Sequence, residues 1–154
     1  MQLKRKHLAA GVAAACSFLS AHSHAADSQV ITISATVNGT CKVQAGSAST
    51  IALAVDPTLT TAVSNSGSVI YRCTKGTSPT VTLSSANSNL LMGPNGAATE
   101  SFAYSSSSSG AVAGSGMGAG QDKTLAVSVT VTQSAAANVS AGTYTDNLTV
   151  TINP

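Results

Sequence analysis

Apolar and hydroxyl-bearing side chains alternate along several stretches of this chain. Ile31, Ile33, Ala35 and Val37 alternate with threonine, serine and asparagine, and residues 125–132 repeat the pattern. A period of two places successive side chains on opposite faces of a β-strand. The chain is also rich in Ser, Thr, Val, Ala and Gly, a mixture that favours strands over helices. The alternation therefore predicts an all-β fold.

Turn-forming residues separate these stretches. They are Asp56-Pro57, Asn65-Ser66-Gly67, Lys75-Gly76, Gly93-Pro94-Asn95-Gly96 and Ala141-Gly142, at a spacing typical of an antiparallel β-sandwich. We expect strands at residues 31–37, 51–55, 68–74, 80–84, 101–104, 125–132 and 143–152.

The first 25 residues have the three parts of a secretory signal peptide. Lys4, Arg5 and Lys6 form a basic region, residues 8–19 form an apolar region, and residues 23–25 form a small-residue cleavage site. A membrane-spanning helix, the first alternative, needs about 20 apolar residues, more than this run provides. A lipoprotein signal ending at Cys16 is the second alternative, because the residues before it loosely resemble a lipobox. We therefore expect export through the periplasm, with residues 26–154 doing the protein's work.

Removal of the signal peptide changes the chemistry available to the chain. It takes away all three histidines and leaves four basic against five acidic residues, a net charge of about −1. This balance disfavours nucleic acid as a partner. Without imidazole, and without a G-x-S-x-G or S-x-x-K motif, we expect no enzyme, no catalytic, cofactor or metal site, and no small-molecule substrate. Isolated carboxylates such as Asp56 and Asp146 fit solvated turns better than a glycosidase pair.

Two cysteines, Cys41 and Cys73, remain after the signal peptide. In an exported chain such a pair predicts one disulfide, which would stabilise the fold by roughly 3 to 4 kcal/mol. A free-thiol nucleophile is the alternative, and it is disfavoured because no histidine could activate either sulfur.

A low-complexity segment covers residues 105–120, with five consecutive serines followed by five glycines at alternate or wider spacing. We expect a flexible surface loop there. The glycines do not satisfy either phosphate-loop pattern, G-x-G-x-x-G or G-x-x-x-x-G-K-[ST].

Several of these features occur together in one known family. They are the alternating strand after the signal, Cys41, the segment GSVIYRCTKG at residues 67–76 and the ending AGTYTDNLTVTI at residues 141–152, with Gly142, Tyr144 and Asp146 as its most specific positions. In this order the chain resembles the spore coat protein U family, which includes subunits of archaic chaperone/usher pili.

The resemblance implies an incomplete immunoglobulin-like sandwich that lacks one edge strand. A periplasmic chaperone would first supply that strand, and the N-terminal segment of the next subunit would then replace it. Ile31, Ile33, Ala35 and Val37 would be the donor-strand residues. The expected organisation is then a signal peptide at 1–25, a donor segment at 26–40 and a pilin-like domain at 41–154. From periodicity alone, residues 30–37 fit equally well as the first strand of the chain's own sandwich.

The function that the resemblance implies is a structural subunit of an extracellular pilus or fimbria at the cell surface. Its partners would be identical or related pilin subunits, the chaperone and an outer-membrane usher, and the fibre would support attachment and biofilm. The alternatives are a spore or cell coat protein that assembles by the same strand exchange, and a fibre-tip adhesin that binds carbohydrate. The adhesin ranks lower because the chain has no Trp and few Tyr for sugar stacking.

Overall fold

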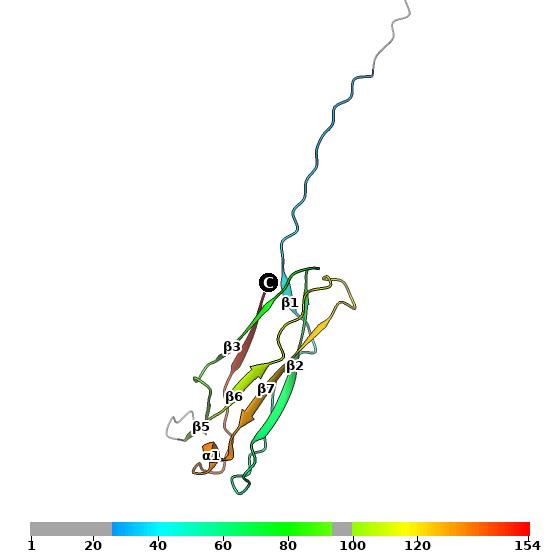
Figure 1. Cartoon of the computed structure of the whole chain (residues 1–154). Helices are drawn as coiled ribbons and strands as arrows, with labels where there is room; N and C mark the ends of the chain where they lie inside the picture. Colours follow the sequence, from blue (N-terminus) through cyan, green and yellow to red (C-terminus); the bar gives the residue numbers. More distant parts are fainter. Residues whose placement is uncertain (1–25, 94–99) are drawn as a thin grey trace, which may run out of the picture. The chain divides into compact units, whose positions relative to one another are not determined.

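A computed structural model describes residues 26–93 and 100–154 of the chain (Figure 1). The residues form two compact units, one ending at Ala35 and the other running from Thr36 to Pro154. We call residues 26–37 the arm, and the rest of the second unit, from Asn38 to Pro154, the body. The expected signal peptide, residues 1–25, lies outside the described residues.

Two long antiparallel strands, β2 (Val63–Cys73) and β7 (Lys123–Val131), form the centre of the body. They pair in register from Val63 opposite Val131 to Tyr71 opposite Lys123. The short strand β1 (Cys41–Val43) pairs with β2, and β6 (Ser105–Ser108) pairs with β7, which gives the order β1-β2-β7-β6. Alternate residues of β2 and β7 are buried, as expected for a sheet with one face on the core.

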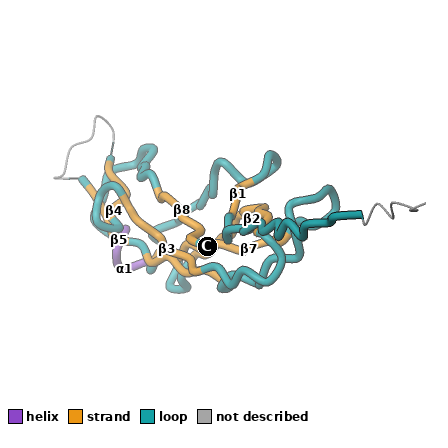
Figure 2. Tube along the Cα trace, turned by 90° about the horizontal axis from the view of Figure 1, so that it is seen from above, coloured by secondary structure: helices purple, strands orange, loops and turns teal. Residues whose placement is uncertain are grey.

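The remaining strands form two smaller antiparallel sheets. β3 (Thr80–Ser85) pairs with the last strand, β8 (Leu148–Asn153), while β4 (Leu90–Met92) pairs with β5 (Ser101–Ala103). Viewed along the body, β1, β2 and β7 lie on one side and β3, β4, β5 and β8 on the other (Figure 2). A single-turn helix, α1 (Gln133–Ala136), follows β7 directly.

The core between these sheets has two parts. The first cluster is built on Tyr71 and Leu125, both fully buried, with Val81, Leu83 and Val150 packed against it. The second cluster is made mainly by residues of β5, β7 and α1: Phe102, Tyr104, Val129, Val131 and Ala136. The fold is thus all-β and antiparallel, as the alternation predicts, and immunoglobulin-like, as the family resemblance implies.

The body has two ends, which we name after the disulfide and the helix α1. The disulfide end holds Cys41, Cys73 and the turn at residues 74–77, where the Gly76 amide donates to the Gly114 carbonyl at 3.0 Å. The helix end holds α1 and the loop at residues 56–62 (Figure 1). β2 and β8 both run toward the disulfide end, and β7 runs from it. In the described part of the chain, no helix is long and apolar enough to cross a membrane.

The expected strands at 68–74, 80–84, 101–104 and 125–132 correspond to β2, β3, β5 and β7, and the end of 143–152 corresponds to β8. One expected turn was wrong, and another, at Gly93-Pro94-Asn95-Gly96, lies mostly outside the described residues. The predicted turn at Asn65-Ser66-Gly67 lies inside β2, where a Cβ on Gly67 would come within 2.9 Å of the Ala48 Cβ. A glycine is needed here because the chain at Ala48 packs directly on the strand and leaves no room for a side chain, and Gly67 makes no turn.

The predicted strand at residues 51–55 is wrong, because these residues join no sheet in the described chain. Their alternation is real, since Ile51, Leu53 and Val55 pack against the core. The backbone instead meets a side chain, as Asn65 Nδ2 donates to the Ala52 carbonyl at 2.7 Å. An alternating segment can therefore cover a core without pairing in a ladder.

The predicted flexible loop at 105–120 is also wrong in part. Its serine run forms β6, which uses the hydrogen-bonding edge of β7. Further along, the Val112 amide donates to the Tyr71 hydroxyl at 2.7 Å, and a Cβ on Gly114 would overlap the carbonyl of Cys73. Serine alternation carries no apolar signal, so the sequence pattern did not reveal this strand.

Candidate functional site

The arm carries a row of exposed apolar side chains. Val30 and Ile33 are each 90% exposed, Val37 is 80% exposed and Ile31 is 79% exposed, and Ala35 between them is exposed as well. Large apolar side chains gathered in this way are typical of an interaction surface. The strand expected at residues 31–37 is not present, because the segment pairs with no other strand in the described chain. A lone extended segment has no ladder to join.

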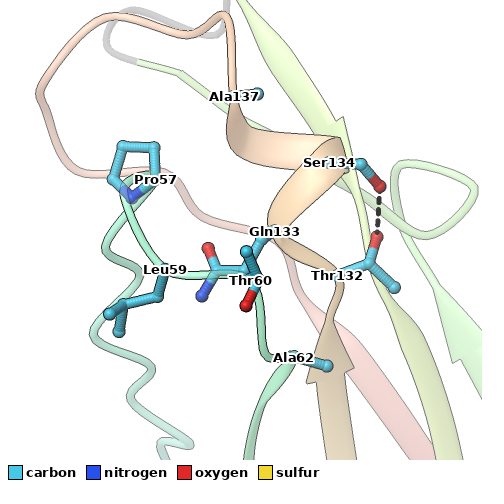
Figure 3. Close-up of a pocket in the computed structure, with 8 residues that line it drawn as sticks. All are labelled: Pro57, Leu59, Thr60, Ala62, Thr132, Gln133, Ser134 and Ala137. Carbon is cyan, nitrogen blue, oxygen red and sulfur yellow. Dashed lines mark hydrogen bonds between the residues drawn. The ribbon is translucent and has the colours of Figure 1, made fainter.

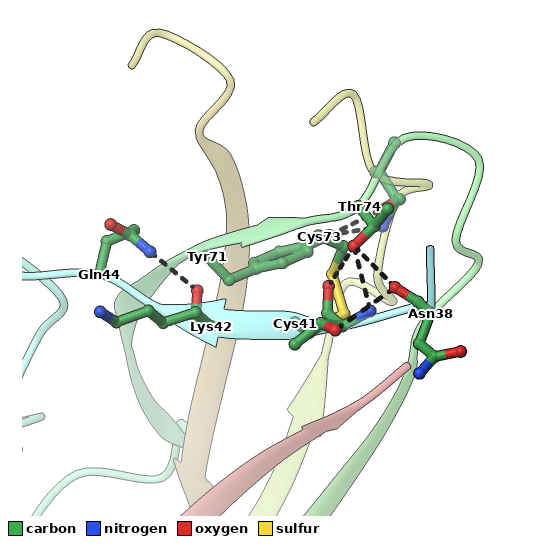
Figure 4. Close-up of a disulfide and its surroundings, with 9 residues drawn as sticks. Asn38, Cys41, Lys42, Gln44, Tyr71, Cys73 and Thr74 are labelled. Atoms are coloured by element: carbon green, nitrogen blue, oxygen red, sulfur yellow. Dashed lines mark hydrogen bonds between the residues drawn. A yellow bond between two sulfur atoms is a disulfide. The ribbon is translucent and has the colours of Figure 1, made fainter. Parts of the chain in front are cut away.

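The chain is fixed to the body immediately after the arm. The Thr40 amide donates to Thr74 Oγ1 at 3.2 Å, and the Thr74 amide donates to the Thr40 carbonyl at 2.9 Å. The Thr74 hydroxyl also donates to the Asn38 carbonyl at 3.4 Å (Figure 4). From Val37 to Cys41 the chain can reach at most roughly 14 Å. The arm is therefore held on a short connection to the disulfide end.

The predicted disulfide joins Cys41 to Cys73 (Figure 4). The two residues face each other across β1 and β2, with a Cα separation of 4.1 Å. Cys73 is fully buried in the first core cluster. The bridge thus fixes the short strand β1, and with it the base of the arm, to the centre of the body.

The inner face of the β3–β8 sheet is less buried than that of the four-stranded sheet that contains β2 and β7. Inward-facing Val81, Leu83 and Val150 are only partly buried, whereas Leu125 of β7 is fully buried. In the described chain this sheet contains two strands, so each of them has one edge without a strand neighbour. A two-stranded sheet with a partly exposed apolar face has room for a further strand.

Asp146, one of the residues quoted for the family likeness, accepts hydrogen bonds from three segments of the chain. Its Oδ2 accepts from the hydroxyls of Ser85 and Tyr104, the latter at 2.6 Å. Its Oδ1 accepts from the Asn87 amide at 3.1 Å and side chain at 2.9 Å, and from the Asn147 amide at 2.8 Å. The carboxylate thus ties the turn after β3 and the end of β5 to the start of β8.

Partial burial alone would raise the pKa of Asp146, but the hydroxyls of Ser85 and Tyr104 and two backbone amides together lower it below 3.8. A lowered pKa contributes stability above the unfolded value, and that contribution is lost as the pH falls through the folded value. We expect Asp146→Asn to lower the free energy of unfolding at pH 7 by about 1 to 3 kcal/mol, because the hydroxyl donors lose their charged acceptor. The loss of stability below pH 3.8 should be shallower in the variant, as measured by urea unfolding at several pH values. An acid profile identical to that of the native protein would contradict this role.

Tyr144 and Gly142 are the other two positions that, with Asp146, are most specific to the family resemblance. The Tyr144 hydroxyl donates to the Ser140 carbonyl at 2.8 Å, and its ring lies 4.9 Å from that of Phe102. Gly142 is exposed in the bend before it. These contacts support the fold at the start of β8. Nothing in the sequence pattern pointed to Ser85, Asn87 or Tyr104 as partners of Asp146, because they are brought together only by tertiary structure.

Within residues 26–93 and 100–154, no group of three or more His, Cys, Asp or Glu side chains is placed to hold a metal ion. The described chain carries an apolar arm, a disulfide shortly after it in sequence and, in the body, an apolar sheet with free edges. This arrangement is suited to strand pairing between chains.

Comparison with known proteins agrees with this arrangement. No curated protein matches the chain. Residues 27–92 match the family model for the Spore Coat Protein U domain, a stretch that contains the arm residues, Cys41 and Cys73. The family comprises pilus, fimbrial or coat-type structural subunits of the extracellular surface. With the fold and the disulfide as described, this match identifies residues 27–92 of the chain as similar to the Spore Coat Protein U domain family.

Proposed function

We propose that this chain is a structural subunit of an extracellular pilus or fimbria, assembled by the chaperone/usher route through donor-strand exchange. The observation that carries the proposal is the arm, whose apolar side chains are exposed while the chain's own β3–β8 sheet has free edges. The fibre would support surface attachment and biofilm.

The physical basis is the pairing of the arm with a neighbour's β8. The alternation of Ile31, Ile33, Ala35 and Val37 puts one apolar face toward the partly exposed Val81, Leu83 and Val150 of that neighbour. Burial of the two isoleucines alone would contribute roughly 3 to 6 kcal/mol. Backbone hydrogen bonds along the free edge would add to this and fix the register.

The proposed partners follow from the same surface. A partly exposed apolar face on a monomer is prone to aggregation. A periplasmic chaperone would cover the face of β3 and β8 until another subunit's arm replaces it, and an outer-membrane usher would bring the two subunits together. Cleavage of the chain before residue 26 would leave the arm at the N-terminus.

Immunolabelling of intact cells tests the proposed function. Antibody against the body should decorate thin surface fibres in negatively stained cells, and the purified fibres should release this chain when heated in denaturant. Label confined to a continuous coat layer, with no fibres, would contradict the pilus assignment and favour the coat alternative.

A further inference from the structure

The charges of the body are divided between its two ends. Lys42 lies in β1 opposite Arg72, Lys123 lies opposite Tyr71, and Lys75 lies in the turn that follows β2. All of these positions belong to the disulfide end. Arg72 is neutralised by Asp122, with Nε 2.6 Å from Oδ1. In residues 26–93 and 100–154 the three lysines, Lys42, Lys75 and Lys123, form no ion pair of their own.

The helix end has the opposite sign. Asp56 begins the loop at residues 56–62, and Glu100 accepts from the Ser140 hydroxyl at 2.7 Å in the segment after α1. Two hydrogen bonds from Thr58 lower the pKa of Asp56, so this carboxylate is ionised at neutral pH. The body is therefore positive at one end and negative at the other.

A pocket of about 430 Å³ opens beside Asp56 at the helix end. Pro57, Leu59 and Ala137 are among its apolar lining residues, and Leu59 is 51% exposed. Gln133 of α1 also lines it and is only 7% exposed (Figure 3). Its Nε2 donates to the Thr61 carbonyl at 2.8 Å, which fixes the amide orientation. Its Oε1 is a buried acceptor with no partner in the described chain, so the pocket holds an unused hydrogen-bonding group.

An apolar projection lies at the positive end. Val112 is 56% exposed and Met117 is 42% exposed, in the segment that bonds to Gly76 beside Lys75. A Cβ on Gly118, next to Met117, would meet no atom within 4 Å, so the backbone is open to approach at this point. Methionine adapts well to irregular apolar pockets. We call residues 112–118 the projection.

We infer that the helix end of one copy docks on the disulfide end of the next, with the pocket at Leu59 and Gln133 receiving the projection and Asp56 facing Lys75. The inference rests on the proposed function for its direction. An arm paired antiparallel to a neighbour's β8, the more stable arrangement, brings Val37 to the start of β8, on the side of the helix end. Because the chain from Val37 to Cys41 reaches only roughly 14 Å, the two ends must then lie against each other.

A charge exchange tests the docking. Asp56→Lys and Lys75→Asp should each slow assembly of the purified mature protein about tenfold at low salt, because charges at the rim of an interface act mainly on the association rate. The double variant should recover to within about threefold of the native rate, since the exchanged pair restores the attraction. Ser66→Lys, in β2, adds one positive charge, half the change made by Asp56→Lys, at an exposed position outside the proposed contact, and should leave the rate unchanged.

A double variant that assembles no faster than the slower single variant would overturn the docking. A second measurement does not depend on rates: fibres that carry both Leu59→Cys and Met117→Cys should oxidise to a covalent ladder of chains, whereas Ser66→Cys with Met117→Cys should not. Fibres that form normally but give no ladder with the first pair would overturn the docking and leave strand exchange intact. Absence of any multimer in the native protein would instead count against the proposed function itself.

Discussion

Replacing Ile31 and Ile33 by aspartate is expected to abolish high-mass, denaturant-resistant multimers while leaving exported monomer detectable. Ile31 is 79% and Ile33 is 90% exposed in the arm, so the substitutions remove little packing from the chain itself. In a neighbour's core each aspartate would be an unpaired buried charge, which costs several kcal/mol. The gain from burying two isoleucines, roughly 3 to 6 kcal/mol, would be lost as well. Gel filtration followed by electrophoresis without heating measures the result.

The arm supplies its own matched control for this prediction. Thr32→Asp with Ser34→Asp adds the same charge to the opposite face of the same segment. On the strand-exchange account those positions face solvent, so multimers should persist. Multimers unchanged by the isoleucine substitutions, or lost equally in both pairs, would show that side-chain burial by the arm does not drive assembly.

Loss of the disulfide is expected to have the largest effect on the stability of the body. Cys41→Ala with Cys73→Ala should lower the free energy of unfolding by about 2 to 5 kcal/mol, because the cross-link limits the unfolded chain. β1 has only three residues and depends on the bridge for its position beside β2. Urea unfolding followed by circular dichroism measures the change, with the slope fitted separately for each protein because the cross-link also limits the surface that the unfolded chain exposes.

Reduction of the native protein is the control for the cysteine variant. A reducing agent should bring its unfolding midpoint close to that of the double alanine variant, since both lack the same bond. A double variant as stable as the oxidised native protein would contradict a stabilising role for the bridge.

The parts of the fold that sequence predicted are those where side-chain alternation and backbone pairing coincide. In β7 every second residue from Leu125 to Val131 is buried, and the same residues pair with β2. The two properties separate at residues 51–55, which alternate and pack without pairing, and in β6, which pairs without apolar alternation. Periodicity reports which side chains are buried, and the hydrogen-bonding neighbour of each strand is decided by tertiary structure.

The candidate site, too, was predictable from the sequence only in part. The disulfide was predictable from the number of cysteines in an exported chain. The apolar face of the arm was predictable from its alternation, and its separate role from the family resemblance. The network around Asp146 could not be predicted, because Ser85 and Tyr104 are far from it in sequence and carry no pattern. The division of charge between the two ends also depends on strand direction, which places Lys42 and Lys123 together.

Whether the arm pairs with a different copy of the chain is the central question, and photo-crosslinking answers it most directly. A photoreactive amino acid replaces Ile33, and fibres are assembled from a mixture of heavy-isotope-labelled and unlabelled chains. Strand exchange predicts crosslinks from residue 33 to β3 or β8, with both isotopic forms joined in the same product. Crosslinks to β3 or β8 formed only within chains of one isotopic form would show that the arm completes its own sandwich, and would contradict the account.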